Sequence, residues 1–555
     1  MKTRILFLIA LLLGVLLFAC AAAEKIGDYE YELNPDGTAT ITSYIGQPAE
    51  ELEVPAELVK KTKKSGETRI TVTAIGDGAF REQKKLTRVV ISEGITDIGD
   101  RAFSGCANLA EVIIPEGVVS IGNYAFSRCG MTSIRLPDSV TEIGRNPFDD
   151  CFSLKEIHVT PDAKGLAVID GVLFSKADKR LVCFPGGLER EEYAIPDGIR
   201  VIDSNAFSGV EMKFDSEYGM YINVYHGPSS LFIPGSVEQI ENRALYQLKN
   251  LTQVIIQEGV TSIGSWAFAG TALTSITIPN SVTEIGEHAF SDCKGLISVS
   301  LPESITAIEQ GTFYGCVNLT SITLPNGLVR IGSLNLDFGT FERCESLISI
   351  TIPDGVEVIG DCAFGMCSNL TSVTIPDSVT QIGSYAFRKC AKLDSVVIPD
   401  NVTSIGNMAF ANCTSLTSVV IPGSVTRIAD GAFSAIEIVN GNDSIGSNLT
   451  SVIIEDGVTS IGDGAFAGCD HLEEIVIPNT VTSIGASAFR GCSSLTLLTI
   501  PDSVVKIENR AFLTLDYKPN TAITFIVSRD SYAAQYCKEI GLNYTYPDAL
   551  DWLNN

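Results

Sequence analysis

The chain has 555 residues, 45% of them hydrophobic, and carries 66 acidic against 39 basic side chains, giving a formal net charge of -27. A surface of this sign repels phosphate backbones and anionic lipid headgroups, which excludes nucleic acid binding and electrostatic docking on a membrane as main roles. The apolar content is sufficient for a large core.

Residues 1–23 have the order of a secretory signal peptide: two basic residues, an apolar run, and small residues up to Ala23. A transmembrane anchor needs roughly 20 apolar residues, so that alternative is close in length, but the alanine-rich end favours cleavage. The tetrapeptide Leu17-Phe18-Ala19-Cys20 also resembles a bacterial lipobox, whose cysteine becomes lipidated, although Phe18 is bulky for that motif. We expect export, with free secretion and lipid anchoring through Cys20 both left open.

Residues 24–68 predict an N-terminal β-hairpin cap. The stretch YEYELNPDGTATITSYIG at 29–46 contains two alternating segments around Asn34-Pro35-Asp36-Gly37, which is the composition of a hairpin turn. Such a hairpin would cover the open edge of the first repeat, whose backbone groups are otherwise unpaired.

A repeat of about 23 residues occupies most of the chain. One residue per repeat, here called the marker residue, is nearly always phenylalanine, and most intervals between markers are 23 residues. The markers are Phe80, Phe103, Phe126, Phe148, Phe207, Leu245, Phe268, Phe290, Phe313, Phe341, Phe364, Phe387, Phe410, Phe433, Phe466, Phe489 and Phe512. A fixed period in this range, with regularly placed leucine and isoleucine, predicts a leucine-rich solenoid whose coils are stabilised by stacking on their neighbours.

The coil LTSVTIPDSVTQIGSYAFRKC at 370–390 shows the expected elements. Its Leu-x-x-Val-x-Ile pattern predicts a short strand with alternate residues inward, which Pro-Asp-Ser ends because proline cannot donate to a strand ladder. Val379 and Ile382 predict a second extended segment, and Gly383 permits a bend before a single helical turn at Phe387. We expect parallel strands about 4.8 Å apart in successive coils.

The phenylalanine column has two interpretations. One phenylalanine per coil at a constant phase predicts a buried spine, in which each ring stabilises the fold by about 1.5–3 kcal/mol. The alternative is an exposed aromatic stripe that binds a ligand. We favour the spine, because every coil repeats the same position.

The unit I-P-x-x-V-x-x-I-G-x-x-A-F-x-x-C, repeated over roughly residues 69–515, resembles the BspA-like class of leucine-rich repeats of exported bacterial surface proteins. The resemblance implies a right-handed solenoid of short parallel β-strands, adhesive or protein-binding roles, and no catalytic motif. With the caps and the single helical turns, the predicted fold class is a β-dominated α/β solenoid capped at both ends.

Insertions lengthen some coils, near residues 152–206, 210–230, 333–339 and 435–448. The first predicts an irregular hairpin coil. Segment 210–230 predicts a projecting hairpin and contains Phe214, Tyr218, Tyr221 and Tyr225, side chains suited to anchoring a protein interface. The alternative, in which these aromatic side chains fold back on the solenoid, stays open.

Residues 516–555 predict a C-terminal cap of strand, helix and strand. Asp530 or Ser531 is placed to cap a helix that ends near Gly541.

Fifteen cysteines in an exported chain suggest disulfides, but their phase argues against pairing. Eleven of them, here called the column cysteines, stand three residues after a marker: Cys106, Cys129, Cys151, Cys293, Cys316, Cys344, Cys367, Cys390, Cys413, Cys469 and Cys492. Equivalent residues of stacked coils are about 4.8 Å apart, whereas the Cβ atoms of a disulfide are about 3.8 Å apart. We predict buried free thiols, with Cys362 at a different phase.

The sequence predicts no catalytic residue, no cofactor and no metal site. The motifs C-x-x-C, H-E-x-x-H, G-x-S-x-G, the P-loop and the calcium-binding loop are absent. The histidines stand at unrelated phases of the repeat: His158, His226, His288 and His471.

The outward positions of the first strand form a second candidate surface. They hold mostly serine, threonine and β-branched residues, and Thr323, Thr351 and Thr374 represent them. Such residues form strands well on a solvated face, and a solenoid sheet is also an extended surface for protein or glycan partners. Both interpretations stay open.

Together these patterns favour an exported, non-enzymatic binding or adhesion protein, monomeric and without a membrane span in the mature chain. Its partner would be an extracellular protein or glycan of a host or a neighbouring cell. The alternative is a passive structural spacer or envelope component without a specific ligand, and a third class is an enzyme with an unrecognised site.

Overall fold

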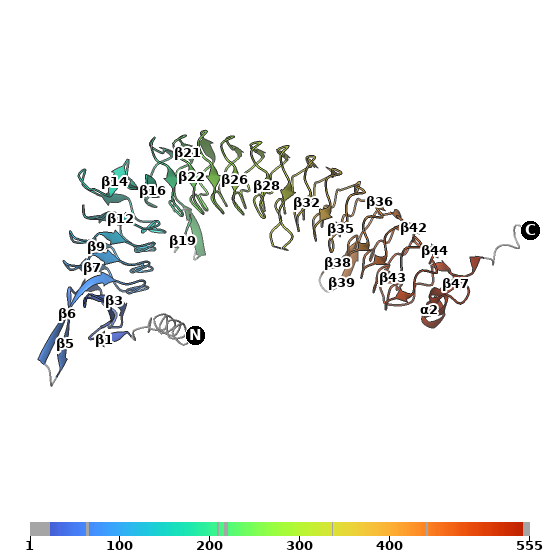
Figure 1. The fold of residues 1–555 in the computed structure, drawn as a ribbon, viewed down its shortest axis with the longest axis horizontal. Helices are drawn as coiled ribbons and strands as arrows, with labels where there is room; N and C mark the ends of the chain where they lie inside the picture. Colours follow the sequence, from blue (N-terminus) through green and yellow to red (C-terminus); the bar gives the residue numbers. More distant parts are fainter. Residues whose placement is uncertain are drawn as a thin grey trace, which may run out of the picture. The chain divides into compact units, whose positions relative to one another are not determined.

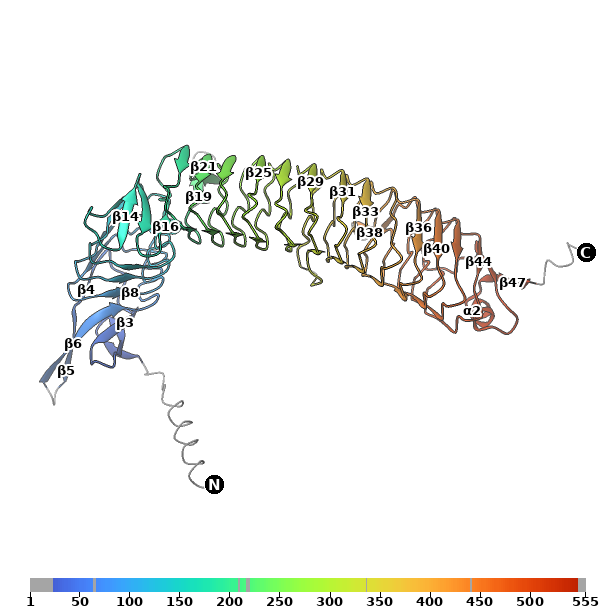
Figure 2. The same ribbon diagram turned by 45° about the horizontal axis from the view of Figure 1, so that its top comes forward.

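The computed structural model describes residues 23–62, 66–207, 210–215, 220–335, 337–439 and 442–547. The predicted signal peptide up to residue 22, with Cys20, lies outside the described residues, and so does Tyr218. The chain divides into two compact units: unit 1 holds residues up to 191 and 198–228, and unit 2 holds 192–197 and 229 onward. Within each unit the coils follow one another in chain order (Figure 1, Figure 2).

The first strands of the coils pair in parallel with their counterparts in neighbouring coils, in groups of two or three strands, and we call the surface that these groups form together the first sheet. In unit 1 its strands are β4 (Glu51–Val54), β7 (Arg88–Ile91), β9 (Glu111–Ile113), β11 (Ser133–Arg135) and β13 (Glu156–His158). In unit 2 they are β17 (Glu192–Ala194), β21 (Ser230–Ile233), β23 (Gln253–Ile256), β25 (Ser275–Thr277), β27 (Ser298–Ser300), β29 (Ser321–Thr323), β31 (Ser349–Thr351), β33 (Ser372–Thr374), β36 (Ser418–Ile421), β40 (Ser451–Ile454), β42 (Glu474–Val476), β44 (Leu497–Thr499), β46 (Thr524–Ile526) and β47 (Asn543–Thr545).

A second set of strands, most of them two residues long, forms the second sheet, with parallel pairing between most neighbouring coils. In unit 1 these are β6 (Gly66–Ile75), β8 (Asp97–Ile98), β10 (Ser120–Ile121), β12 (Glu142–Ile143), β16 (Arg180–Cys183) and β18 (Val201–Ile202). In unit 2 they are β22 (Gln239–Ile240), β24 (Ser262–Ile263), β26 (Glu284–Ile285), β28 (Ala307–Ile308), β30 (Arg330–Ile331), β32 (Val358–Ile359), β34 (Gln381–Ile382), β35 (Ser404–Ile405), β37 (Arg427–Ile428), β41 (Ser460–Ile461), β43 (Ser483–Ile484) and β45 (Lys506–Ile507). The predicted leucine-rich solenoid of short parallel strands is confirmed, with about 19 turns.

The segment around each marker residue is a run of tight turns, where the sequence predicted a single helical turn. In one coil, the N–H groups of Tyr385 and Phe387 donate to Asn407 and Ala409 of the next coil, each at 2.8 Å. The N–H of Cys390 instead donates to Phe387 three residues back in its own coil. Because alternate N–H groups are shared with the neighbouring coil, the segment adds a third ladder of hydrogen bonds and cannot close a regular helix.

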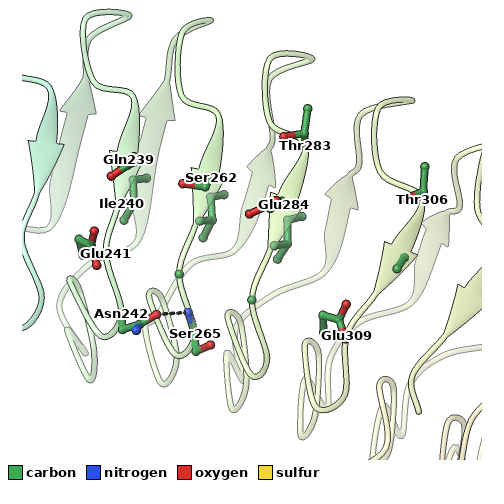
Figure 3. A pocket seen from close by; sticks show the side chains of 15 residues that line it. Gln239, Ile240, Glu241, Asn242, Ser262, Ser265, Thr283, Glu284, Thr306 and Glu309 are labelled. Carbon is green, nitrogen blue, oxygen red and sulfur yellow. Dashed lines mark hydrogen bonds between the residues drawn. The ribbon is translucent and has the colours of Figure 1, made fainter. Parts of the chain in front are cut away.

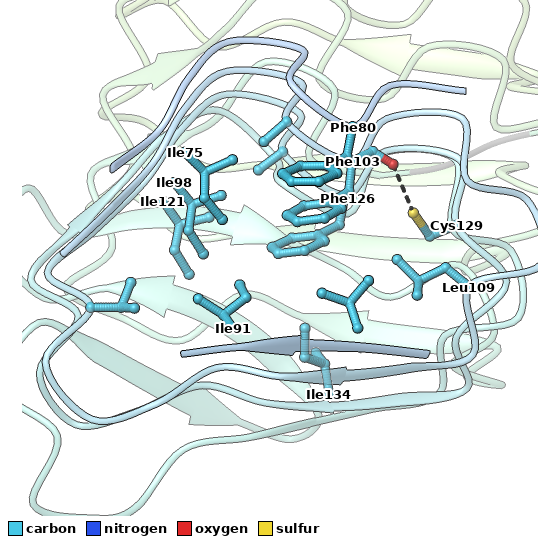
Figure 4. Packing of buried hydrophobic residues seen from close by; sticks show 14 of the residues in the cluster. Ile75, Phe80, Ile91, Ile98, Phe103, Leu109, Ile121, Phe126, Cys129 and Ile134 are labelled. Atoms are coloured by element: carbon cyan, nitrogen blue, oxygen red, sulfur yellow. Dashed lines mark hydrogen bonds between the residues drawn. The ribbon is translucent and has the colours of Figure 1, made fainter. Parts of the chain in front are cut away.

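The marker phenylalanines form the predicted buried spine (Figure 4). In unit 1, Phe80 and Phe103 stack with ring centroids 5.0 Å apart and planes within 6°. In unit 2, Phe364 and Phe387 stack at 5.3 Å and 10°, and both are fully buried. The aromatic stripe alternative is therefore wrong: these rings are core, and their faces are covered by equivalent rings.

Two further aromatic residues extend the spine at places the marker pattern did not reveal. Phe184, within the irregular 152–206 interval, stacks on Phe207 at 5.0 Å and 21°. Tyr44, within the N-terminal segment, stacks on Phe80 at 5.8 Å and 26°.

The insertions add antiparallel strands to the coils. β14 (Leu166–Ile169) and β15 (Val172–Ser175) pair antiparallel with each other, β15 pairs antiparallel with β16, and β16 then joins the parallel second sheet of unit 1. β19 (Val210–Asp215) and β20 (Met220–Tyr225) form a hairpin, and so do β38 (Ile436–Val439) and β39 (Asn442–Ile445).

The N-terminal segment adds antiparallel strands to the coils, and the C-terminal segment adds a helix. β1 (Glu24–Ile26), β2 (Tyr29–Leu33) and β3 (Ala39–Tyr44) pair antiparallel in chain order, β3 continues in parallel onto β6, and β5 (Glu57–Thr62) pairs antiparallel with β6. At the other end α2 (Tyr532–Ile540) begins at Ser531, whose hydroxyl accepts from the N–H of Ala534, and ends at Gly541 in the left-handed region.

Candidate functional site

The outward side of the first sheet in unit 2 carries the candidate threonines. In β31 and β33 the middle residues Ile350 and Val373 are buried, while the flanking serine and threonine of each strand are exposed. This alternation follows from the two-residue period of a strand, so each coil presents one serine and one threonine or its equivalent to solvent.

Parallel register brings the exposed residues into columns. Thr351 is the partner of Thr374, and Ser300 is the partner of Thr323. β29 and β31 are neighbours, so Thr323, Thr351 and Thr374 stand in one column of successive coils. The structure thus brings together three of the residues that the sequence singled out.

The hydroxyl groups of this column are available for hydrogen bonds to a ligand. Within the described residues, Thr323, Thr351 and Thr374 make no side-chain hydrogen bond to the protein. Threonines that stand just before a strand differ in both sheets. The hydroxyl of Thr403, before β35, donates to the carbonyl of Thr380 at 3.2 Å. The hydroxyl of Thr371, before β33, donates to the carbonyl of Ile348 at 3.1 Å. Hydroxyls that already bond to the preceding coil are poor ligand groups, so the outward threonines within the first-sheet strands are the better candidates for polar recognition.

The aromatic hairpin lies in unit 1. Phe214 of β19 and Tyr221 of β20 are cross-strand partners, and Tyr225 at the end of β20 is 44% exposed. Next to it, the ring of His226 stacks on Phe152 with centroids 4.9 Å apart, which holds the base of the hairpin against the coils of unit 1.

A shallow groove of about 530 Å³ lies over the second sheet of unit 2 (Figure 3). It is lined by residues of four coils, including the carboxylates of Glu241, Glu284 and Glu309. Asn242 accepts a 2.8 Å hydrogen bond from the N–H of Ser265 across its floor. Glu309 is paired with Arg330. Its lining combines serine and threonine hydroxyls with these carboxylates, and histidine and cysteine are not among the lining residues.

The four histidines are held separately. His158 contacts Glu156 at 3.1 Å on the first sheet of unit 1, His288 stacks on Trp266, and His471 contacts the carbonyl of Ser447. Across the described residues, no group of three or more His, Cys, Asp or Glu side chains is arranged to hold a metal ion.

The fourteen cysteines among the described residues are free thiols, and all but Cys362 are buried. The thiol of each column cysteine donates to the carbonyl oxygen of the marker residue in the preceding coil, as Cys129 does to Phe103 at 3.3 Å (Figure 4). Burial raises the pKa of Cys106 to about 11 and that of Cys413 to about 12. These thiols therefore stay neutral and serve the packing of the coils.

The part of the chain that the structure describes contains no helix with the length and apolar character that a membrane crossing requires.

The profile of the "BspA type Leucine rich repeat region (6 copies)" matches residues 73–209, 225–335, 334–445 and 444–540. The chain belongs to the BspA-type leucine-rich repeat family. No curated protein shows significant similarity to the chain.

Several solved structures are similar to this BspA-type chain. A leucine-rich repeat protein from Bacteroides ovatus is 23% identical, over 94% of this chain and 99% of that one, with a TM-score of 0.45. A leucine rich cell surface protein from Faecalibacterium prausnitzii is 23% identical, over 69% and 94%, with a TM-score of 0.29. The pneumococcal vaccine antigen PcpA is 14% identical, over 95% and 98%, with a TM-score of 0.29.

Proposed function

We propose that this BspA-type protein is an exported binding or adhesion protein, secreted or held at the cell surface, whose solenoid presents the first sheet to an extracellular protein or glycan. The supporting observation is the exposed column of Thr323, Thr351 and Thr374, whose hydroxyls have no partner within the described residues. Stacked coils that repeat the same hydroxyl at a fixed spacing suit an extended partner better than a small molecule.

Export rests on the sequence of residues 1–23. The choice between secretion and a lipid anchor depends on whether cleavage leaves Cys20 as the first residue of the mature protein. Mass spectrometry of the mature N-terminus distinguishes the two, because a lipidated Cys20 adds the mass of its acyl chains. An uncleaved N-terminus would contradict both.

The hairpin of β19 and β20 is proposed as a second contact element, through Phe214, Tyr218, Tyr221 and Tyr225. Aromatic side chains of this kind are enriched where interfaces derive most of their binding energy. Deleting residues 210–228 is expected to weaken binding at least tenfold if these side chains contact the partner. Unchanged affinity would exclude the hairpin from the contact surface.

The test of the function is a binding screen of the mature protein, as a monomer, against extracellular matrix proteins, glycan arrays and intact cells. Saturable binding to one class supports the proposal. A passive structural spacer predicts no saturable ligand in any of these assays. Substrate turnover that a single point mutation abolishes would overturn the non-enzymatic assignment.

A further inference from the structure

One column of the first sheet changes its chemistry along unit 2. The positions occupied by Thr323, Thr351 and Thr374 are taken over in the following coils by four apolar residues, which we call the apolar stripe: Val397, Val420, Ile453 and Val476. These four side chains are 78%, 44%, 49% and 53% exposed.

Three residues of the stripe stand in register over a buried core, and Val397 stands one coil before Val420. Val420 is the partner of Ile453, and Ile453 is the partner of Val476, in parallel register. The inward neighbours Val419 and Ile475 are buried. Four coils at about 4.8 Å spacing make a strip about 14 Å long. Adjacent exposed apolar side chains in a row are unusual on an isolated surface and mark contact sites.

The rim of the stripe carries charge of one sign. The first-sheet segments 394–400, 417–424, 450–457, 473–480 and 496–502 contain no lysine, arginine or histidine. They contain seven acidic residues, all exposed: Asp394, Asp400, Glu455, Asp456, Glu473, Glu474 and Asp502. Within the described residues Glu473 and Glu474 make no ion pair, so their charge is available to a partner.

We propose that the apolar stripe and its acidic rim bind a cationic amphipathic helical segment of a partner protein. The pitch of a helix, about 5.4 Å per turn, lies close to the coil spacing, so apolar residues one turn apart would each meet one coil. About 10 helical residues match the length of the stripe. Lysine or arginine on both flanks of the helix would face the acidic rim.

A second copy of this chain does not fit the same surface. Self-association through the stripe would bring two acidic rims together, and the whole chain has a net charge of -27. Like charges placed opposite each other oppose association. The inference rests on the proposed function only in taking the first sheet as a contact surface.

The probe is an amphipathic lysine/leucine peptide of about four helical turns, with leucine at i, i+3, i+4 and i+7. Binding to the mature protein is followed by fluorescence anisotropy at two salt concentrations. We expect saturable binding that weakens with salt, and a loss of at least tenfold in the triple variant Val420→Thr, Ile453→Thr and Val476→Thr. The variant Glu473→Gln with Glu474→Gln should weaken binding and reduce its salt dependence.

The matched control changes Val329 and Val505 to threonine. Both valines are exposed, at 45% and 65%, but lie on the second sheet side of their coils, so peptide affinity should not change. Unchanged peptide binding in the stripe variant, or equal binding of a peptide with glutamate in place of lysine, overturns the inference.

The outcome for the stripe can be distinguished from that for the proposed function. If the peptide does not bind while a partner from the screen still binds the hydroxyl column, the proposed function stands without this site. A shift in the sedimentation of the stripe variant alone would assign the stripe to self-association instead.

Discussion

The thiol of Cys390 lies 3.2 Å from the carbonyl oxygen of Phe364, the marker residue of the preceding coil. The same contact recurs at every column cysteine, between Cys413 and Phe387 at 3.2 Å and between Cys492 and Phe466 at 3.3 Å, for example. A small thiol fits under the spine and satisfies a carbonyl that faces the core. Cysteine is thus a structural residue of the coil, although the chain is predicted to be exported.

The column cysteines are expected to resist thiol reagents in the folded protein. Their pKa values are raised, chiefly by burial, so they remain protonated well above neutral pH, and the thiolate is the reactive form. Ellman's reagent at about pH 8 should label them only after denaturation. Rapid labelling of any column cysteine in the native protein would contradict the assignment.

Substitution of Phe387 by alanine should destabilise the protein by about 3–5 kcal/mol, because it leaves a cavity between two stacked rings in a dry core. The destabilisation should be concentrated in the coils on either side of Phe387, because each coil contacts only its neighbours. Urea denaturation followed by circular dichroism measures the loss. Val329, which is 45% exposed, is the control, and its alanine variant should cost less than about 1 kcal/mol.

Gly406 stands where one coil passes close to the next. A Cβ atom at this position would lie 2.3 Å from the backbone nitrogen of Ser384, and backbone atoms cannot move aside without breaking the ladder. Gly406→Ala should therefore cost about 1–3 kcal/mol. Gly446 has no neighbouring atom within 4 Å of the corresponding site, so Gly446→Ala should leave the denaturation midpoint nearly unchanged; equal effects of the two substitutions would refute this explanation.

His288 should make stability depend on pH. Burial lowers the pKa of this histidine, and Asp337 opposes the effect. Its ring stacks on Trp266 with centroids 4.1 Å apart. Because the folded pKa lies below the unfolded value of about 6.5, the contribution is present above about pH 6.5 and is lost as the pH falls.

The measurement is the urea midpoint, followed by tryptophan fluorescence, between about pH 7.5 and about pH 5.5. The loss of stability over this interval should be smaller in His288→Gln than in the parent protein. Identical slopes in the two proteins would show that other groups carry the pH dependence.

The sequence predicted the repeat, the spine and the buried cysteines, because each depends on a residue type that recurs at one phase. It missed Phe184, which enters the spine from a Cys-Phe-Pro-Gly stretch without the usual alanine, and Tyr44, which enters from the N-terminal strands. A side chain that is buried by an insertion or by a terminal segment does not recur at a fixed period. Its contacts are therefore visible only in the structure.

The candidate surface was predicted only in part. Threonine occurs both within strands and just before them, and the sequence does not reveal that Thr403 donates its hydroxyl to the preceding coil while Thr374 does not. Likewise Val397 and Val420 are ordinary strand residues by type. The apolar stripe arises only from the register that places Val420 beside Ile453, across an insertion in the chain, and Ile453 beside Val476.

The central claim is that the first sheet contacts the partner, and a matched pair of variants tests it most directly. Thr323, Thr351 and Thr374 are changed together to arginine, and Val329 and Val505 are changed to arginine as the control outside the first sheet. The affinity for the partner identified by the screen should fall at least tenfold in the first variant and stay unchanged in the control, with the same denaturation midpoint in both. Equal affinity of the two variants would contradict the claim.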